Sequence, residues 1–88
     1  MSLQQIITRY LEHLQVERAL SPHSVIAYQR DLVLLIRYAE TLALGHWREL
    51  SSEALRGFIA QQHKRGLAPK SLHRLLSACR NFFRYLAR

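Results

Sequence analysis

Apolar residues recur along the chain with the spacing of helices, and no useful stretch alternates with the period of two that marks a strand. The first apolar face consists of Leu3, Ile6, Ile7, Tyr10, Leu11 and Leu14. The second consists of Val25, Tyr28, Leu32, Leu35, Ile36, Ala39 and Leu42, and the third of Leu55, Phe58 and Ile59. Each face has members three, four or seven residues apart, so the pattern predicts a helix in each of these regions.

Turn-forming residues between these patterns predict where the helices begin and end. The residues expected at helix starts are Ser21 and Pro22 for the second helix, Ser51 or Ser52 for the third, and Pro69 for the fourth. The residues expected at helix ends are Gly45 and Gly66. Between the second and third helices, the segment LGHWREL is predicted to be a loop that Trp47 and Leu50 anchor to the core.

The fourth helix is predicted to bury one face and to present a basic face opposite it. At about 100° per residue, one arc of this helix contains Leu72, Leu75, Leu76, Cys79, Phe82, Phe83 and Leu86. The opposite face contains Lys70, Arg74, Ser77, Asn81, Arg84 and Arg88, with Ser71, His73 and Arg80 at its edges. Four helices joined by short loops within 88 residues predict one all-α domain, a compact four-helix bundle.

The charge of the chain is concentrated in its C-terminal part. The formal net charge is +7, but residues 1–53 carry five basic and six acidic residues, whereas residues 54–88 carry eight basic residues and no acidic one. A basic surface on part of a small domain indicates a polyanionic partner, with nucleic acid as the main candidate. A solvated basic face and a face for an acidic protein remain the alternatives.

Other classes of site find little support in the sequence. The single cysteine, Cys79, excludes an internal disulfide and is predicted to be a packed thiol in a reducing compartment. The five histidines lack the spacing of a zinc site, and the isolated glycines form no phosphate loop. No apolar run reaches the roughly 20 residues of a membrane span, and no signal peptide is evident. A cytoplasmic protein without cofactor, metal, membrane contact or small-molecule ligand is therefore expected.

The starts of the second and fourth helices are the best candidates for a nucleic-acid interface. The fourth helix offers Lys70, Ser71, Arg74 and Ser77 in its first turns, and the second offers His23, Ser24, Ala27 and Arg30 away from its apolar face. Hydroxyls, cations and free backbone N–H groups at a helix start suit phosphate oxygens. An arginine such as Arg74 can also pair with guanine in the major groove.

Two segments, ERALSPHSVIAYQRDL and RGLAPKSLHRLLSACRNFFRYL, resemble the N-terminal part of Xer-type tyrosine recombinases, the XerC branch more than the XerD branch. The resemblance implies a core-binding domain of four or five helices with a SAM-like orthogonal fold, which lays two helices against the major groove of duplex DNA. The positions that it matches to DNA contacts are His23, Ser24, Ala27, Arg65, Lys70, Ser71, Arg74 and Ser77. The sequence departs from the family's usual residues at Leu75 and Cys79, which lie on the apolar arc.

The same resemblance implies what this chain does not do by itself. The catalytic residues of the family lie in a second domain, so residues 1–88 are expected to bind DNA without breaking or rejoining it. The whole protein is then expected to be a site-specific recombinase of the chromosome dimer resolution type that works with a second, identical or homologous, recombinase subunit. Two alternatives remain: a basic helical protein-interaction module, and the core-binding domain of a phage or integron integrase.

The helical pattern also predicts how far the four tyrosines and three outer apolar residues of the second helix are buried. Tyr10 and Tyr28 are predicted to lie in the core, and Tyr38 and Tyr85 to be amphipathic surface residues. None has the arginine and histidine neighbours of a catalytic nucleophile. Three apolar residues lie off the inner face of the second helix, where the first helix, a partner subunit or a further domain would cover them: Ile26, Val33 and Leu34.

Overall fold

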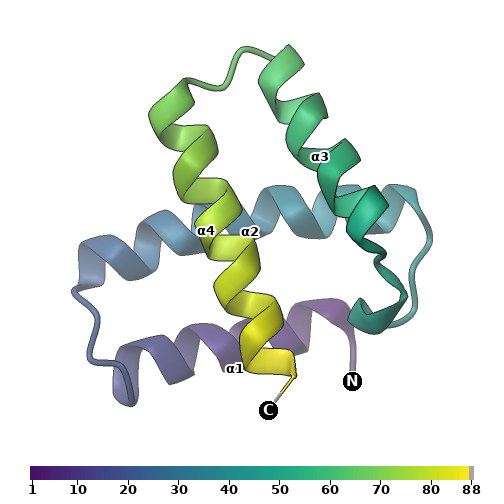
Figure 1. Ribbon diagram of the computed structural model, residues 1–88. Coiled ribbons are helices and arrows are strands. Elements are labelled where there is room, and N and C mark those ends of the chain that lie inside the picture. The colour runs from purple at the N-terminus through teal and green to yellow at the C-terminus, as the bar shows by residue number, and fades with distance from the viewer. Residues whose placement is uncertain (88) are drawn as a thin grey trace.

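A computed structural model describes residues 1–87, and Arg88, expected on the basic face, lies outside the described residues. The elements in chain order are α1 (Leu3–Val16), α2 (Pro22–Thr41), a short 3-10 helix (Trp47–Glu49), α3 (Ser52–Lys64) and α4 (Pro69–Leu86) (Figure 1). No strand occurs within residues 1–87. The prediction of an all-α domain of four helices is confirmed.

Hydrogen bonds at the helix starts explain why the chain enters each helix where it does. The Ser21 hydroxyl oxygen accepts a hydrogen bond of 3.2 Å from the Ser24 N–H, and Pro22 occupies the first helical position of α2. The Ser51 hydroxyl oxygen accepts one of 3.0 Å from the Ala54 N–H at the start of α3. Such caps satisfy N–H groups that the helix itself leaves without an acceptor. Ser21 and Ser51 are therefore the caps, as the sequence predicts.

The ends of α2 and α3 differ in how they reach the left-handed conformation. Gly66 follows α3 with a φ of 91°, as expected for a glycine that ends a helix. After α2, which ends at Thr41, the left-handed residue is Ala43, with a φ of 56°. The prediction that Gly45 stops this helix is wrong, because the chain has already turned there. The Gly45 N–H instead donates a 2.9 Å hydrogen bond to Glu49 Oε1 within the loop.

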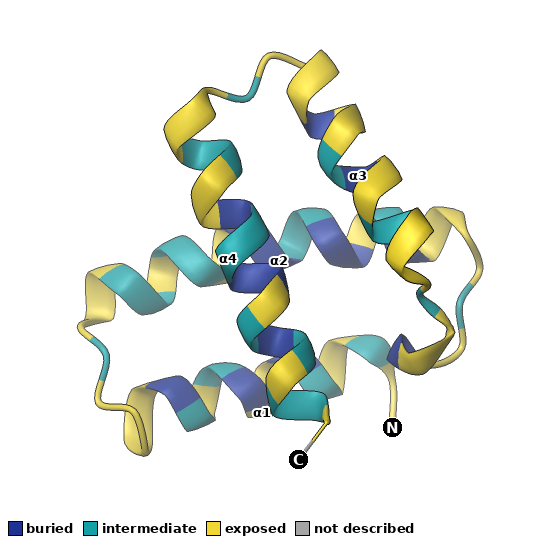
Figure 2. Ribbon diagram, viewed as in Figure 1, coloured by how far each residue is buried: buried dark blue, intermediate teal, exposed yellow. Residues whose placement is uncertain are grey.

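The core forms where α4 crosses the other helices (Figure 1). Helix α4 packs across α2 and beside α3, while α1 packs along α2. Figure 2 shows the buried positions of α4 at its crossing with α2 and from there toward α1. The buried apolar residues are Ile7, Tyr10, Leu14, Leu32, Leu35, Ile36, Ala39, Trp47, Phe58, Leu75, Ala78, Cys79 and Phe82. Three members of the predicted arc of α4 are thus fully buried, and its other four are half-buried. Three of these four pack against the core: Leu72, Phe83 and Leu86.

Aromatic rings connect the C-terminal half of α4 to α1 and to the loop after α2. The Phe82 ring centroid lies 5.3 Å from that of Tyr10 and 5.2 Å from that of Trp47. The Trp47 ring meets Phe82 edge-on, an arrangement that aromatic pairs favour. Trp47 is buried and Leu50 packs against the core, so the prediction that both residues anchor the loop is confirmed.

Three of the four tyrosines differ in burial from what the sequence predicts. Tyr10 is buried, as expected, whereas Tyr28 is half-buried. The prediction of surface positions for the other two is wrong, because both pack against rings of a neighbouring helix. The Tyr38 centroid lies 5.1 Å from that of Phe58, and the Tyr85 centroid lies 5.0 Å from that of Tyr10.

The apolar residues at the outer side of α2 have different environments. Ile26 is 47% exposed and Leu42, which caps the helix end instead of lying on its inner face, is 43% exposed. Leu34 is half-buried and packs against the core, and Val33 lines a hollow between α1 and α2. Helix α1 therefore covers part of the outer side of α2. Within residues 1–87, no helix combines the length and the apolar character that crossing a membrane requires.

Candidate nucleic-acid interface

Seven of the eight candidate residues come from α2 and α4, whose first halves lie on the same side of the molecule. Figure 1 shows α4 crossing α2 near its middle, with both helix starts on the left and the loop that leads into α4 above them. The exposed candidates are His23, Arg65, Lys70 and Arg74, and the half-buried ones are Ser24, Ala27, Ser71 and Ser77. Arg65 differs from the others in position, because it caps the end of α3 and precedes the loop to α4.

The start of α4 is open to an anion. Its N-cap is Ala68, which has no side-chain oxygen, and the first residue is Pro69. Among the described residues no side chain caps this start and no acid occupies its first turn, whereas serines cap α1, α2 and α3. The free N–H groups and the positive end of the helix dipole favour negative charge at this point. The exposed Lys70 and the half-buried Ser71 add a cation and a hydroxyl there.

The start of α2, unlike that of α4, has a side-chain cap that satisfies part of its hydrogen-bonding groups. The Ser21 hydroxyl donates a 3.1 Å hydrogen bond to Ser24 Oγ, in addition to capping the helix. Ser24 can therefore still donate its own hydroxyl hydrogen to an outside acceptor. Within the described residues, the first turn of α2 carries no acid, and His23 and Arg30 are exposed on the first three turns. This end of α2 suits contacts with phosphate groups and offers few side chains that can read bases.

One ion pair joins the two helices at their crossing. Arg74 of α4 donates hydrogen bonds from Nε to Asp31 Oδ2, at 2.8 Å, and from Nη2 to Asp31 Oδ1, at 2.9 Å. The Asp31 side chain is 3% exposed and the Arg74 side chain is 44% exposed. The hydrogen bond to Asp31 raises the pKa of Arg74 above its ordinary value, and the nearby Tyr28 phenol adds to this effect. Arg74 is thus held at one edge while part of it remains open to solvent.

Asp31 is the functional candidate that reasoning from the sequence missed. It lies three residues after Tyr28 and four before Leu35, so the helical period places it on the inner face of α2. An acid on an apolar face needs a cation, because an unpaired buried charge is costly. Helix α4 carries several basic residues and no acid, so it could supply that cation. The spacing could have shown that Asp31 is buried, but not which basic residue pairs with it.

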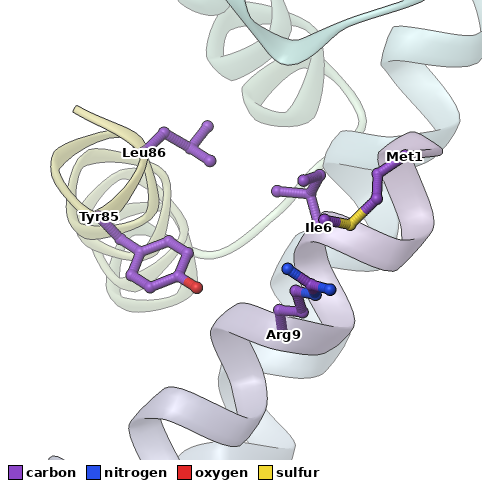
Figure 3. Close-up of a pocket in the computed structure, with 5 residues that line it drawn as sticks. All are labelled: Met1, Ile6, Arg9, Tyr85 and Leu86. Carbon is purple, nitrogen blue, oxygen red and sulfur yellow. The ribbon is translucent and has the colours of Figure 1, made fainter. Parts of the chain in front are cut away.

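Other basic residues lie away from this side of the molecule. Arg80 and Arg84, near the C-terminal end of α4, line a hollow of about 490 Å³ against Leu55 of α3. A second hollow, of about 280 Å³, lies between α1 and the end of α4. Figure 3 shows Tyr85 and Leu86 on one side of it and Met1, Ile6 and Arg9 on the other. The positive charge is therefore divided among several surfaces, and the helix starts form one of them.

The Cys79 thiol and the possible metal ligands of the chain form no further candidate site among the described residues. Cys79 is fully buried, and this burial raises the pKa of its thiol to about 12. The thiol therefore stays protonated near neutral pH, which confirms the prediction of a packed cysteine. In the part of the chain that the structure describes, no group of three or more His, Cys, Asp or Glu side chains is placed to hold a metal ion.

Known proteins match the chain over nearly its whole length. Residues 7–88 match the family described as phage integrase, N-terminal SAM-like domain. The tyrosine recombinase XerC of Pseudomonas syringae pv. tomato is 42% identical over 86 residues, which cover 98% of this chain and 29% of that protein. The tyrosine recombinase XerC of Xanthomonas campestris pv. campestris is 47% identical over 77 residues, which cover 88% of this chain and 24% of that protein.

These matches apply to the N-terminal SAM-like domain and to a small part of each relative. The chain spans less than a third of the length of the curated relatives that it matches. No solved structure matches it. The family match covers all four α-helices apart from the first turn of α1, and it agrees with the observed bundle. The resemblance stated from the two sequence segments is thereby confirmed, and the chain belongs to the N-terminal SAM-like domain family of phage integrases.

Proposed function

We propose that this chain is the DNA-binding module of a site-specific tyrosine recombinase of the XerC type, and that it binds duplex DNA through the starts of α2 and α4. The observation that carries the proposal is the position of both helix starts on one side of the bundle, with their candidate residues exposed or half-buried. A helix start that points into a major groove can contact phosphates and base edges together. The relatives named XerC support this choice over a phage or integron integrase.

The two helices have different tasks in this proposal. The uncapped start of α4 and Lys70 bind phosphate oxygens, and the exposed His23 adds a contact from the start of α2. Arg74 lies one turn after Lys70, and its exposed edge reaches the bases. Ala27 is small enough to let α2 approach the groove closely. Arg65 and Ser77 extend the contact at the two ends of this surface, and Ser71 adds a hydroxyl beside Lys70.

The activity of the whole protein follows from the same proposal. A further domain breaks and rejoins the DNA, and a second recombinase subunit, identical or homologous, occupies the other half of the recombination site in the cytoplasm. The module itself contributes affinity and position. It therefore forms no covalent adduct with a nicked recombination site, and detection of such an adduct with the purified 88-residue chain would contradict this part of the proposal.

The DNA-binding proposal is tested by fluorescence anisotropy at several salt concentrations. The probes are a duplex selected from a random pool by repeated binding to the chain, a scrambled duplex and inorganic polyphosphate. The selected duplex is expected to bind most tightly, and Lys70→Ala is expected to reduce the slope of log affinity against log salt by about one. Arg9→Ala removes the same charge from the hollow between α1 and the end of α4, away from the helix starts, and is the matched control, with an unchanged slope.

The outcomes separate the two classes of function. Selective binding that weakens with Lys70→Ala but not with Arg9→Ala supports a DNA interface at the helix starts. Equal binding of all three probes, or an equal effect of both substitutions, contradicts it. In that case a basic module for an acidic protein becomes the better description.

A further inference from the structure

The Asp31–Arg74 pair uses only one edge of the arginine side chain. A guanidinium group has five N–H donors, one on Nε and two on each Nη. The carboxylate of Asp31 accepts from Nε and Nη2, at 2.8 and 2.9 Å. Two donors on Nη1 and one on Nη2 remain outside this pair. One N–H of Nη1 and the remaining N–H of Nη2 form the end-on edge of the group, which presents two parallel N–H bonds.

The two partners of the pair differ strongly in burial. Asp31 is almost completely buried at the crossing of α2 and α4, whereas the Arg74 side chain is 44% exposed. The acid therefore holds the guanidinium from the inner side, and the open part of Arg74 faces solvent. A long arginine side chain otherwise samples many rotamers, and ordering it on binding costs free energy. The pair removes most of this freedom before any ligand arrives.

We infer that Asp31 is a positioning residue, which orients the end-on edge of Arg74 so that it pairs with O6 and N7 of one guanine in the bound duplex. This inference rests on the proposed DNA-binding function and adds the base that the module reads and the residue that fixes the reader. Two parallel N–H donors match the two acceptors on the major-groove edge of guanine, and adenine offers only one acceptor there. Asp31 does not touch DNA itself, because Arg74 covers it.

The alternative role for the same edge is a phosphate contact. Arginine also pairs with two phosphate oxygens. A phosphate contact makes every duplex bind more tightly, whereas a guanine contact favours only duplexes with guanine at one position. A base analogue separates the two roles, because 7-deazaguanine lacks the N7 acceptor and leaves the phosphate backbone unchanged.

The test measures the affinity of the chain for the selected duplex with each guanine in turn replaced by 7-deazaguanine. One replacement is expected to weaken the wild-type chain by roughly 5- to 150-fold, the range for leaving one buried donor without its acceptor, because O6 is retained. The same replacement should have little effect on Asp31→Asn and Arg74→Lys, because neither variant presents the oriented edge. Affinity for the scrambled duplex should be unchanged in Asp31→Asn. The Arg9→Ala variant should respond to 7-deazaguanine as the wild type does.

These outcomes distinguish failure of the inference from failure of the proposed function. Selective DNA binding with equal sensitivity to 7-deazaguanine in the wild type and in Asp31→Asn overturns the inference alone. Selective binding that no 7-deazaguanine replacement weakens also overturns it, and makes Arg74 a phosphate contact. Absence of selective binding by the wild-type chain removes the proposed function, and the inference with it.

A measurement on the wild-type chain covers the case in which Asp31→Asn does not fold. The Nε–H and Nη–H signals of Arg74 are observed by NMR, free and with the selected duplex. The Nε–H signal should be protected from exchange in both states, and the Nη1 protons should shift only on binding. Loss of the protected Nε–H signal in the complex would show that Arg74 leaves Asp31 to reach DNA, and would overturn the inference.

Discussion

The indole Nε1 of Trp47 donates a 3.0 Å hydrogen bond to the carbonyl oxygen of Leu3, 44 residues earlier in the chain. This bond attaches the 3-10 helix after α2 to the first turn of α1. The Trp47 ring also meets Phe82 of α4 edge-on. One buried side chain therefore connects three segments that are distant in sequence, and its removal should loosen all three together.

Trp47→Phe keeps an aromatic ring but removes the hydrogen bond and part of the buried area. We expect a loss of about 1–3 kcal/mol in the free energy of unfolding, from the hydrogen bond and the remaining cavity. Because this is the only tryptophan of the chain, urea unfolding should be followed by circular dichroism. The neighbouring exposed Arg48→Ala is the control and should change stability by less than about 0.5 kcal/mol. Equal effects of the two substitutions would refute the anchoring role.

Phe82→Ala should destabilise the bundle most among single substitutions in α4. Phe82 is fully buried and contacts rings of α1, the loop and its own helix. Truncation of a buried phenylalanine costs about 3–5 kcal/mol, which is a large part of the stability of a small domain. A thermal melt by circular dichroism should show a strongly lowered midpoint or no cooperative transition. Phe83→Ala, at a half-buried position, should cost clearly less.

Gly57→Ala should stabilise the protein. Gly57 lies in the interior of α3, is exposed, and has room for a methyl group, because an added Cβ would lie 3.4 Å from the Tyr38 hydroxyl oxygen. Alanine is favoured over glycine in a helix interior by about 0.5–1 kcal/mol, and we expect a gain of that size in chemical unfolding. Gly66→Ala is the opposite case, because a φ of 91° strains any residue with a side chain. A loss of stability with Gly57→Ala would mean that Tyr38 requires the space.

Stability should fall at high pH because of Cys79. Burial raises the pKa of this thiol from 9.0 to about 12. The folded state therefore favours the protonated thiol, and this contribution is complete below pH 9 and is lost as the pH rises toward 12. The slope contributed by one such group approaches about 1.4 kcal/mol per pH unit. Urea unfolding between pH 8 and 11 should show a steeper loss for the wild type than for Cys79→Ala, and parallel curves would contradict the expectation.

The helices and their buried faces could be predicted because each depends on spacing within one segment. Leu75, Cys79 and Phe82 share an arc by helical geometry alone, and the structure buries all three. The burial of Tyr38 and Tyr85 could not be predicted in this way, because it depends on rings supplied by other helices. Local periodicity identifies which face a helix buries, but not how far its edge residues are covered.

In the candidate site, too, features that depend on one helix could be predicted, and contacts between helices could not. The exposure of Lys70 follows from its position on the polar face of α4 and was predicted. The pairing of Arg74 with Asp31 spans 43 residues and depends on where α4 crosses α2. The left-handed φ of Ala43 could not be predicted either, because alanine rarely adopts this conformation and the residue type gives no sign of it. Contacts between helices and strained turns therefore required the structure.

The Asp31–Arg74 pair should stabilise the fold, and a double-mutant cycle measures its contribution. Arg74→Ala leaves the buried carboxylate of Asp31 without its two donors, and removal of one partner of a fully buried pair costs about 3–5 kcal/mol. Because Arg74 is 44% exposed, water can replace part of the lost interaction, and a cost of about 1–3 kcal/mol is expected here. The double variant Asp31→Asn with Arg74→Ala should cost less than the sum of the two single variants, because no unpaired charge remains. Additive costs would show that the two side chains contribute independently, and that the hydrogen bonds between them do little to hold α2 against α4.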